Sequence, residues 1–227
     1  RPGKILSLAG NYREHIVESG FARVTDQDAI TPQMFLKPAT CLIGDDAEAT
    51  LSPANVRVGW EVELAVVVGR PARQVLREAA MRHVFGYTIL NDLSERGLNA
   101  RLEQRRVRER DPVFDWLAGK WFDGFAPCGP WIVTADEIPD PHALGMRLSV
   151  NGELRQQGRT SDMIFDIPTL IAEASAIMTL EPGDIIATGT PAGAGLGTGE
   201  SFLRHGDQVD CEIDRIGVLR TRIRGQA

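Results

Sequence analysis

The alternation of hydrophobic and polar residues along the chain predicts a protein built mainly from β-strands. Short runs rich in β-branched residues end in glycine, proline, asparagine or aspartate, which is the pattern of strands bounded by turns. Ser149–Leu154 carries an Asn-Gly pair between strand-like residues, which indicates a two-residue hairpin turn. The predicted strands are Lys4–Leu8, Glu61–Val68, Val84–Leu90, Trp131–Val133, Arg147–Val150, Asp184–Thr188, Gln208–Ile213 and Gly217–Ile223.

Helical spacing of hydrophobic residues is confined to a few segments. It predicts helices over Asn11–Glu18, Leu98–Arg110 and Pro168–Ala176, the last with Asp166 as its cap. The chain shows no repeat, low-complexity tract or linker, so residues 1–227 are expected to form one domain. The predicted fold class is therefore mainly β with a few short helices.

Composition narrows the classes of partner. The 227 residues carry a net charge of -6, which argues against a large nucleic-acid footprint and favours a small molecule, although Arg101–Arg110 is locally basic. Cys41, Cys128 and Cys211 are isolated, as expected for buried thiols in a reducing cytoplasm. No apolar run is long enough to predict a membrane span or a secretory signal.

Three acidic residues stand where hydrophobic strands begin or end. Glu61 and Glu63 are two apart in "WEVELAVVVG" and share one strand face, while Asp92 follows "VFGYTIL". Oxygen ligands of this kind suit Mg²⁺ or Mn²⁺ better than zinc, which usually draws on histidine and cysteine. The alternative is that the glutamates are solvated or paired with Arg57 and Arg70.

A second candidate constellation lies in "NYREHIVE". His15 and Glu18 are three residues apart, so a helical turn places them on one face, where a carboxylate beside an imidazole can activate water. Such pairs are also frequent on solvated helices, and the spacing alone does not separate the two interpretations. Lys120 and Lys37, taken alone, are equally compatible with structural roles.

The chain resembles the fumarylacetoacetate hydrolase family over nearly its whole length. The resemblance rests on "ILSLAGNYREHIVE", "MFLKPATCLIG", "WEVELAVVVG", "GYTILNDLSER", "GKWFDGFAPCGPWIV" and "LEPGDIIATGTPAG". It is strongest for the small bacterial branch of acylpyruvases, oxaloacetate decarboxylases and 2-hydroxyhepta-2,4-diene-1,7-dioate isomerases. It implies a mixed β-sandwich roll, a cytoplasmic homodimer, and Mg²⁺ or Mn²⁺ on Glu61, Glu63 and Asp92.

The resemblance also assigns roles around that ion. It implies that His15 and Glu18 deprotonate water and that Lys120 assists catalysis. Substrate contact is expected from four further residues, although a supporting role stays open for the lysine: Thr190, Gly189, Arg96 and Lys37.

The implied reaction is cleavage of a carbon–carbon bond in an acylpyruvate or 2,4-diketo acid. Decarboxylation of oxaloacetate and isomerisation of a 2-hydroxy-diene-dioate are alternatives on the same site, and a non-catalytic metal-stabilised scaffold is the alternative from another class. The Arg-rich segment 97–118 departs from the family pattern, so it is a candidate for reading a distal carboxylate, for a subunit contact, or for a solvated helix.

Overall fold

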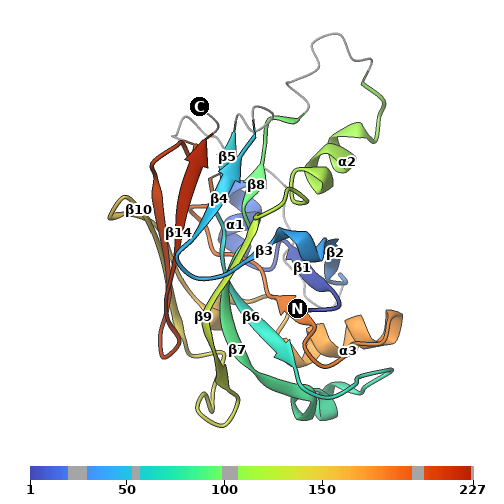
Figure 1. Cartoon of the computed structure of the whole chain (residues 1–227). Helices are drawn as coiled ribbons and strands as arrows, with labels where there is room; N and C mark the ends of the chain where they lie inside the picture. Colours follow the sequence, from blue (N-terminus) through green and yellow to red (C-terminus); the bar gives the residue numbers. More distant parts are fainter. Residues whose placement is uncertain (20–29, 53–56, 99–106, 196–201, 226–227) are drawn as a thin grey trace.

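Two mixed β-sheets form the framework of the computed structural model, which describes residues 1–19, 30–52, 57–98, 107–195 and 202–225 (Figure 1). The larger sheet has the strand order β2-β1-β12-β6-β7-β9-β3, and the smaller has the order β11-β10-β13-β14-β4. Strands β5 and β8 form a third, two-stranded sheet. The bounds are β1 Ile5–Ala9, β2 Gln33–Lys37, β3 Leu42–Ile43, β4 Ala47–Leu51, β5 Val58–Gly59, β6 Val62–Val68, β7 Val84–Asn91, β8 Ser94–Glu95, β9 Ala126–Thr134, β10 Gly145–Val150, β11 Glu153–Arg159, β12 Ile185–Ala187, β13 Gln208–Ile213 and β14 Gly217–Gly225.

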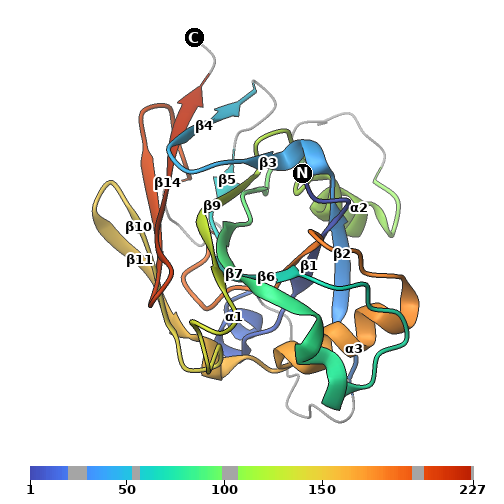
Figure 2. The same ribbon diagram turned by 60° about the horizontal axis from the view of Figure 1, so that its bottom comes forward.

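The larger sheet curls so that β2 and β3, at its two edges, approach each other across an interior (Figure 2). Most neighbours in both sheets are antiparallel, but β1 pairs with β12, β14 with β4, and β3 with β9 in parallel. Outside the curl, the larger sheet packs on the smaller one. Leu64 and Ile89 from the larger sheet and Leu148 and Leu219 from the smaller belong to this main hydrophobic core. The mixed β-sandwich roll expected from the resemblance is confirmed.

Every residue of β6 is buried, because its two faces meet different cores. Leu64, Val66 and Val68 point into the main core between the sheets. Ala65, on the opposite face, packs with Leu90 and others in a smaller apolar cluster. Since side chains alternate along a strand, Glu63 shares the face of Ala65 and is directed to the interior of the curled sheet.

In the described residues, three α-helices flank the sheets: α1 (Arg13–Glu18), α2 (Asp111–Ala118) and α3 (Ile167–Ile177). α3 confirms the helix predicted over Pro168–Ala176. Its cap is confirmed too, because the Asp166 carboxylate accepts a hydrogen bond from the Thr169 amide at 3.0 Å. Short 3₁₀ segments are also present at Ala39–Cys41, Arg77–His83 and Thr160–Asp162.

The helix predicted over Leu98–Arg110 is wrong over Val107–Arg110, which leads into a turn. Leu98 is in 3₁₀ conformation, and residues 99–106 lie outside the described residues. The helix begins instead at Asp111, whose carboxylate accepts a hydrogen bond from the Arg108 amide at 2.8 Å. Pro112 explains the boundary, because proline lacks the amide hydrogen that a helix interior requires and is tolerated in the first turn.

The predicted strands are present, and the Asn-Gly hairpin joins β10 to β11. Asn151 and Gly152 both have positive φ, at 53° and 81°, as a two-residue type I′ turn requires. β2 and β4 were not predicted, because only part of each is buried and their hydrophobic signal is correspondingly weak. Cys41 and Cys211 are buried thiols as predicted, whereas Cys128 is only partly buried. Among the described residues, no helix is long and apolar enough to cross a membrane.

Candidate active site

Strand pairing brings the three acidic residues together at one end of β6 and β7. Val62 is in register with Asn91, and the Asp92 amide donates to the Glu61 carbonyl at 2.9 Å, so Asp92 lies beside Glu61. One carboxylate oxygen from each of Glu61, Glu63 and Asp92 lies within 4.8 Å of the other two. All three residues are buried, with Glu63 and Asp92 entirely so. The predicted convergence of these acids is therefore present in the structure.

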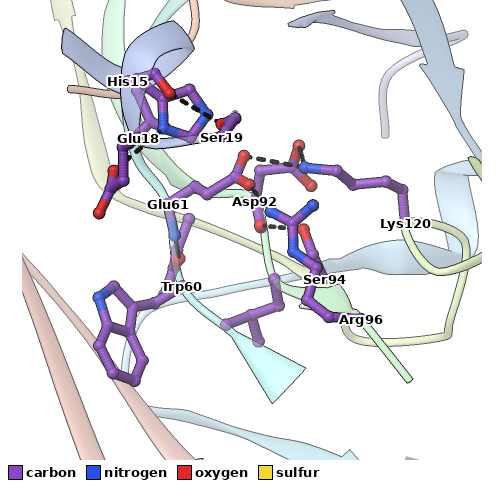
Figure 3. Close-up of polar contacts among 12 residues, drawn as sticks. His15, Glu18, Ser19, Trp60, Glu61, Asp92, Ser94, Arg96 and Lys120 are labelled. Carbon is purple, nitrogen blue, oxygen red and sulfur yellow. Dashed lines mark hydrogen bonds and ion pairs between the residues drawn. The ribbon is translucent and has the colours of Figure 1, made fainter. Parts of the chain in front are cut away.

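Three basic side chains contact the acids. Lys120 Nζ lies 2.8 Å from both Glu61 Oε2 and Asp92 Oδ2 and bridges them (Figure 3). Arg96 pairs with Glu61 Oε1, and Lys37 pairs with Asp92 Oδ1. All of these ion pairs are with Glu61 and Asp92, which offsets much of the cost of burying those two carboxylates and leaves Glu63 outside them. Among the ion pairs of the described residues, none joins Arg57 or Arg70 to Glu61 or Glu63, so the alternative pairing is wrong.

Lys120 is also enclosed by aromatic rings. Its Nζ lies 5.5 Å from the ring centre of Phe35 on β2 and 5.7 Å from that of Trp116 on α2. Both distances suit a cation–π interaction. The two rings pack edge to face, so the lysine is held between the edge strand β2 and helix α2. Lys120 therefore lies at the acidic cluster and is not a surface lysine.

Lys37 occupies the far side of Asp92. Its side chain is fully buried, and Nζ also donates to the Leu93 carbonyl at 3.4 Å. The ammonium group is therefore engaged on the protein side of the carboxylate. This placement favours support of Asp92 over the substrate contact that the resemblance suggested.

The two glutamates of β6 differ in their electrostatic environment. Burial alone would raise the pKa of Glu61, but Lys120 and Arg96 outweigh it and lower that pKa to about 2. The pKa of Glu63 is raised well above its ordinary value, by burial first and then by repulsion from Asp92 and Glu61. None of the ion pairs of the described residues includes Glu63, so no paired basic side chain brings its pKa back down. The site therefore favours an additional cation, or a proton, at Glu63.

The donor set fits a divalent ion. Glu63 Oε2 accepts a hydrogen bond from the Gly189 amide at 2.7 Å, whereas Oε1 is buried and has no hydrogen-bond partner among the described residues. A buried carboxylate oxygen without a partner, on a glutamate that is clustered with two further carboxylates, is costly unless a cation neutralises it. Carboxylate oxygens are the ligands that Mg²⁺ and Mn²⁺ prefer.

Helix α1 places His15 and Glu18 beside these acids (Figure 3). His15 Nδ1 lies 3.6 Å from Glu18 Oε2, and this nitrogen has no hydrogen-bond partner in the described structure. Glu18 is held in place by the Gly193 amide, which donates to Oε2 at 3.0 Å. His15 is close enough to Glu61 for its charge to lower the pKa of that carboxyl. The predicted pair therefore forms and faces the acidic cluster.

Asn11, which was not predicted as a site residue, fastens the start of this segment. Its side-chain amide donates to the carbonyls of Thr188 at 2.7 Å and Phe165 at 3.0 Å, and its oxygen accepts from the Phe165 amide. A Cβ atom at Gly189 would lie 2.8 Å from Asn11 Cβ, so only glycine fits there. The sequence predicted Asn11 as the first residue of the helix, whereas α1 begins at Arg13 with Tyr12 as its N-cap. Its tethering role was missed because its partners are distant in the sequence.

The loop after β12 supplies Gly189 and Thr190. Thr190 is buried, and its hydroxyl accepts a hydrogen bond from Gln156 Nε2 at 2.9 Å. Asn91 was also missed, although its side-chain oxygen accepts from the Glu61 amide at 3.0 Å and fixes the start of β6. The roles of Thr190, Gly189 and Arg96 toward a substrate stay predictions.

The chain is similar to known proteins over nearly its whole length. Residues 4–224 match the family model "Fumarylacetoacetate (FAA) hydrolase C-terminal". The human mitochondrial oxaloacetate tautomerase FAHD2A is 38% identical over 98% of this chain and 67% of its own length. The 2,4-didehydro-3-deoxy-L-rhamnonate hydrolase of a Sphingomonas species is also 38% identical, over 97% of this chain and 73% of its own length.

The fold is also similar to that of solved structures. A fumarylpyruvate hydrolase from Pseudomonas aeruginosa, crystallised with Mn²⁺ and pyruvate, superposes with a TM-score of 0.83 at 27% identity, covering 99% of this chain and 91% of that one. Its bound Mn²⁺ agrees with the carboxylate cluster of this chain as a site suited to a divalent metal. The chain is therefore a metal-dependent enzyme that belongs to the fumarylacetoacetate hydrolase family.

Proposed function

We propose that the chain hydrolyses a carbon–carbon bond of a small acylpyruvate or related 2,4-diketo acid, using Mg²⁺ or Mn²⁺ held by Glu61, Glu63 and Asp92. The observation that carries the proposal is the buried, unpartnered Glu63 oxygen among three converging carboxylates. The similarity to a fumarylpyruvate hydrolase supports the substrate class. When bound, the ion would supply Lewis acidity that stabilises negative charge developing on the substrate oxygens.

Basic and polar groups around the acids would bind the anionic end of the substrate. Lys120 Nζ lies 2.8 Å from carboxylate oxygens of both Glu61 and Asp92. A substrate carboxylate that binds beside these two acids would therefore lie close to the ammonium group. Arg96 has a buried Nε without a hydrogen-bond partner among the described residues, which leaves a donor for the same purpose. Thr190 and the Gly189 loop would orient the carboxylate from the other side.

His15 would act as the general base, with Glu18 as its partner. The gap of 3.6 Å between Nδ1 and Glu18 is longer than a hydrogen bond, but such contacts often shorten when substrate binds. With Nδ1–H directed at Glu18, the other ring nitrogen can take a proton from water. The water oxygen adds to the distal carbonyl, the carbon–carbon bond breaks, and the proton returns from His15 to the carbon that received the electron pair. The products are pyruvate and a carboxylic acid.

A panel of substrates tests the proposal. The protein loaded with Mg²⁺ or Mn²⁺ is incubated with acylpyruvates of increasing chain length, and pyruvate release is measured. We expect turnover by the wild-type protein and loss of turnover in both Glu63→Gln and His15→Ala, with bound metal retained only in His15→Ala. Absence of pyruvate release from every acylpyruvate would contradict the proposed hydrolysis.

A second candidate is keto–enol interconversion of oxaloacetate, which the 38% identity to the human tautomerase favours. This reaction moves one proton between carbon and oxygen, and His15 is placed to carry it without attacking water. Adding oxaloacetate to that panel separates the two functions, because a tautomerase changes the enol absorbance of oxaloacetate without releasing pyruvate. Pyruvate release from oxaloacetate would instead indicate the decarboxylase.

We also propose that the chain acts in the cytoplasm as a homodimer on a small oxo-acid, with no nucleic-acid or membrane partner, as the family resemblance implies. A molar mass close to twice 24.9 kDa in light scattering would support the dimer. A mass of one chain would contradict it.

A further inference from the structure

Gln156 on β11 is a buried amide that joins the strand of acidic residues to the Thr190 loop. Its Oε1 accepts a hydrogen bond at 2.9 Å from the amide of Val62, which stands between Glu61 and Glu63. Its Nε2 donates to Thr190 Oγ1 at 2.9 Å and to the Pro191 carbonyl at 2.8 Å. One side chain, only 1% exposed, therefore connects both parts of the site.

These contacts fix which way each hydrogen bond runs. A backbone amide can only donate, so the oxygen of Gln156 must face Val62 and its NH₂ must face Thr190. One hydrogen of that NH₂ goes to the Pro191 carbonyl and the other to the Thr190 hydroxyl oxygen. Thr190 is thereby an acceptor toward Gln156, and its own hydroxyl hydrogen is left to be donated elsewhere.

The loop has little freedom to alter this arrangement. A Cβ atom at Gly158 would lie 2.5 Å from Pro191 Cβ, and one at Gly193 would lie 2.2 Å from the Arg155 carbonyl oxygen. The segment from Pro191 to Gly193 is thus packed directly on the backbone and side chains of β11. Thr190 cannot exchange its partner without separating the loop from the strand.

We infer that Gln156 is a positioning residue that makes Thr190 a hydrogen-bond donor to the carboxylate of the substrate. The inference rests on the proposed role of Thr190 in the substrate site. A carboxylate can only accept hydrogen bonds, so a threonine that receives a hydrogen bond from Gln156 has the polarity that it requires. An acceptor in place of the Gln156 NH₂ would reverse that polarity.

Gln156→Glu tests the inference, because it keeps the size and the acceptor for Val62 but offers Thr190 an acceptor. Thr190 then donates to the introduced carboxylate and loses the hydrogen meant for the ligand. We expect the Kd of pyruvate for the Mn²⁺-loaded protein, measured by calorimetry, to rise about tenfold or more, the usual loss for one hydrogen bond to a charged group. Gln157→Glu is the matched control, since Gln157 is exposed on the same strand and the Kd of this variant should match that of the wild type.

A double-mutant cycle separates positioning from simple charge repulsion. Thr190→Val removes the hydroxyl and should raise the Kd by a similar factor, after which Gln156→Glu should add little. Gln156→Met leaves the Thr190 hydroxyl free to donate and should raise the Kd less than Gln156→Glu. If Gln156→Glu does not fold, Gln156→Met is combined with Thr190→Val instead. The Kd of pyruvate for this double variant should then rise by less than the product of the rises in the two single variants.

Several results would overturn the inference. These are an unchanged Kd in Gln156→Glu, an equal loss in the Thr190→Val background, or an equal loss in Gln156→Met. An unchanged Kd in Thr190→Val would remove the Thr190 role and the inference with it. Failure of the proposed hydrolysis is separate, because it would appear as absent acylpyruvate turnover while pyruvate binding still responds to Gln156.

Discussion

Replacing Glu63 by glutamine should affect stability in opposite directions with and without metal. The side chain is fully buried, and its pKa is raised by burial, Asp92 and Glu61. Glutamine has the same shape but no charge. Its oxygen can accept from the Gly189 amide as Oε2 does now, and its NH₂ would stand at the unpartnered Oε1, where it can donate to a neighbouring carboxylate.

The magnitude follows from the ordinary pKa of glutamate. A carboxyl whose pKa is raised by folding contributes stability at low pH that is lost as pH rises from the ordinary value toward the folded one. At pH 7, which is 2.5 pH units above the ordinary value of 4.5, this loss reaches at most about 3.4 kcal/mol at about 1.4 kcal/mol per unit. We therefore expect metal-free Glu63→Gln to be about 1–3 kcal/mol more stable than the wild type at pH 7. At pH 5 the gain should shrink below about 1 kcal/mol.

Bound metal should make the wild type the more stable of the two proteins. A ligand at 100 times its Kd stabilises the folded state by about 2.7 kcal/mol, and the wild type gains this while the glutamine variant has lost a charged ligand. Urea unfolding at pH 5 and pH 7, in EDTA and in excess Mn²⁺, measures all four combinations. Glu173→Gln, an exposed glutamate on α3, is the matched control and should change little.

Two outcomes would refute the reasoning about Glu63. If the glutamine variant is less stable than the wild type in EDTA at pH 7, the buried carboxyl is not under the electrostatic stress described above. If Mn²⁺ stabilises both proteins equally, Glu63 is not a metal ligand.

Three further predictions concern other parts of the molecule. Lys37→Met should lower the free energy of unfolding by up to about 3–5 kcal/mol in urea titrations, because it leaves the buried Oδ1 of Asp92 without a basic partner and only Lys120 on Oδ2; a loss within error of zero would show that Lys120 suffices. His15→Ala should keep its Mn²⁺ content but lose about 10²–10⁴ in kcat for hydrolysis, and undiminished kcat would exclude His15 as the base. Asn151→Ala should cost about 1–2 kcal/mol, since alanine disfavours the φ of 53° at the hairpin, and an unchanged thermal midpoint would contradict this.

Much of the fold was predictable because its strands carry a strong local signal. β6 and β7 are nearly continuous apolar runs, and Asn151-Gly152 marks its own turn. β2 was missed because its buried residues depend on partners that fold over it from elsewhere in the chain. The start of α2 was misplaced because the basic run before it mimics a charged helix, whereas Pro112 sets the boundary.

The acids of the site stand out in the local sequence pattern, whereas Lys120, Arg96 and Lys37 were named as site residues only through the family resemblance. An acid at the edge of an apolar strand is conspicuous locally, so Glu61, Glu63 and Asp92 were recognisable. Arg96 and Lys120 meet Glu61 only through tertiary folding, and no local pattern pairs them. Gln156 gave no signal, because a glutamine in a half-exposed strand is expected to face solvent.

The ion pairs of the site constrain how a divalent ion can enter it. Each oxygen of Glu61 and Asp92 already contacts a basic nitrogen, from Arg96, Lys37 or Lys120, and only Glu63 Oε1 lacks a partner among the carboxylate oxygens of these three described acids. An ion held by all three acids would therefore share these oxygens with the basic groups or displace one of them. Lys120 is best placed to yield, because it is shared between two carboxylates, whereas Lys37 is fixed behind Asp92 by the Leu93 carbonyl. The ammonium released in this way carries a positive charge beside the acids, and a substrate carboxylate can then neutralise it. Metal binding would thus prepare the site for an anionic substrate.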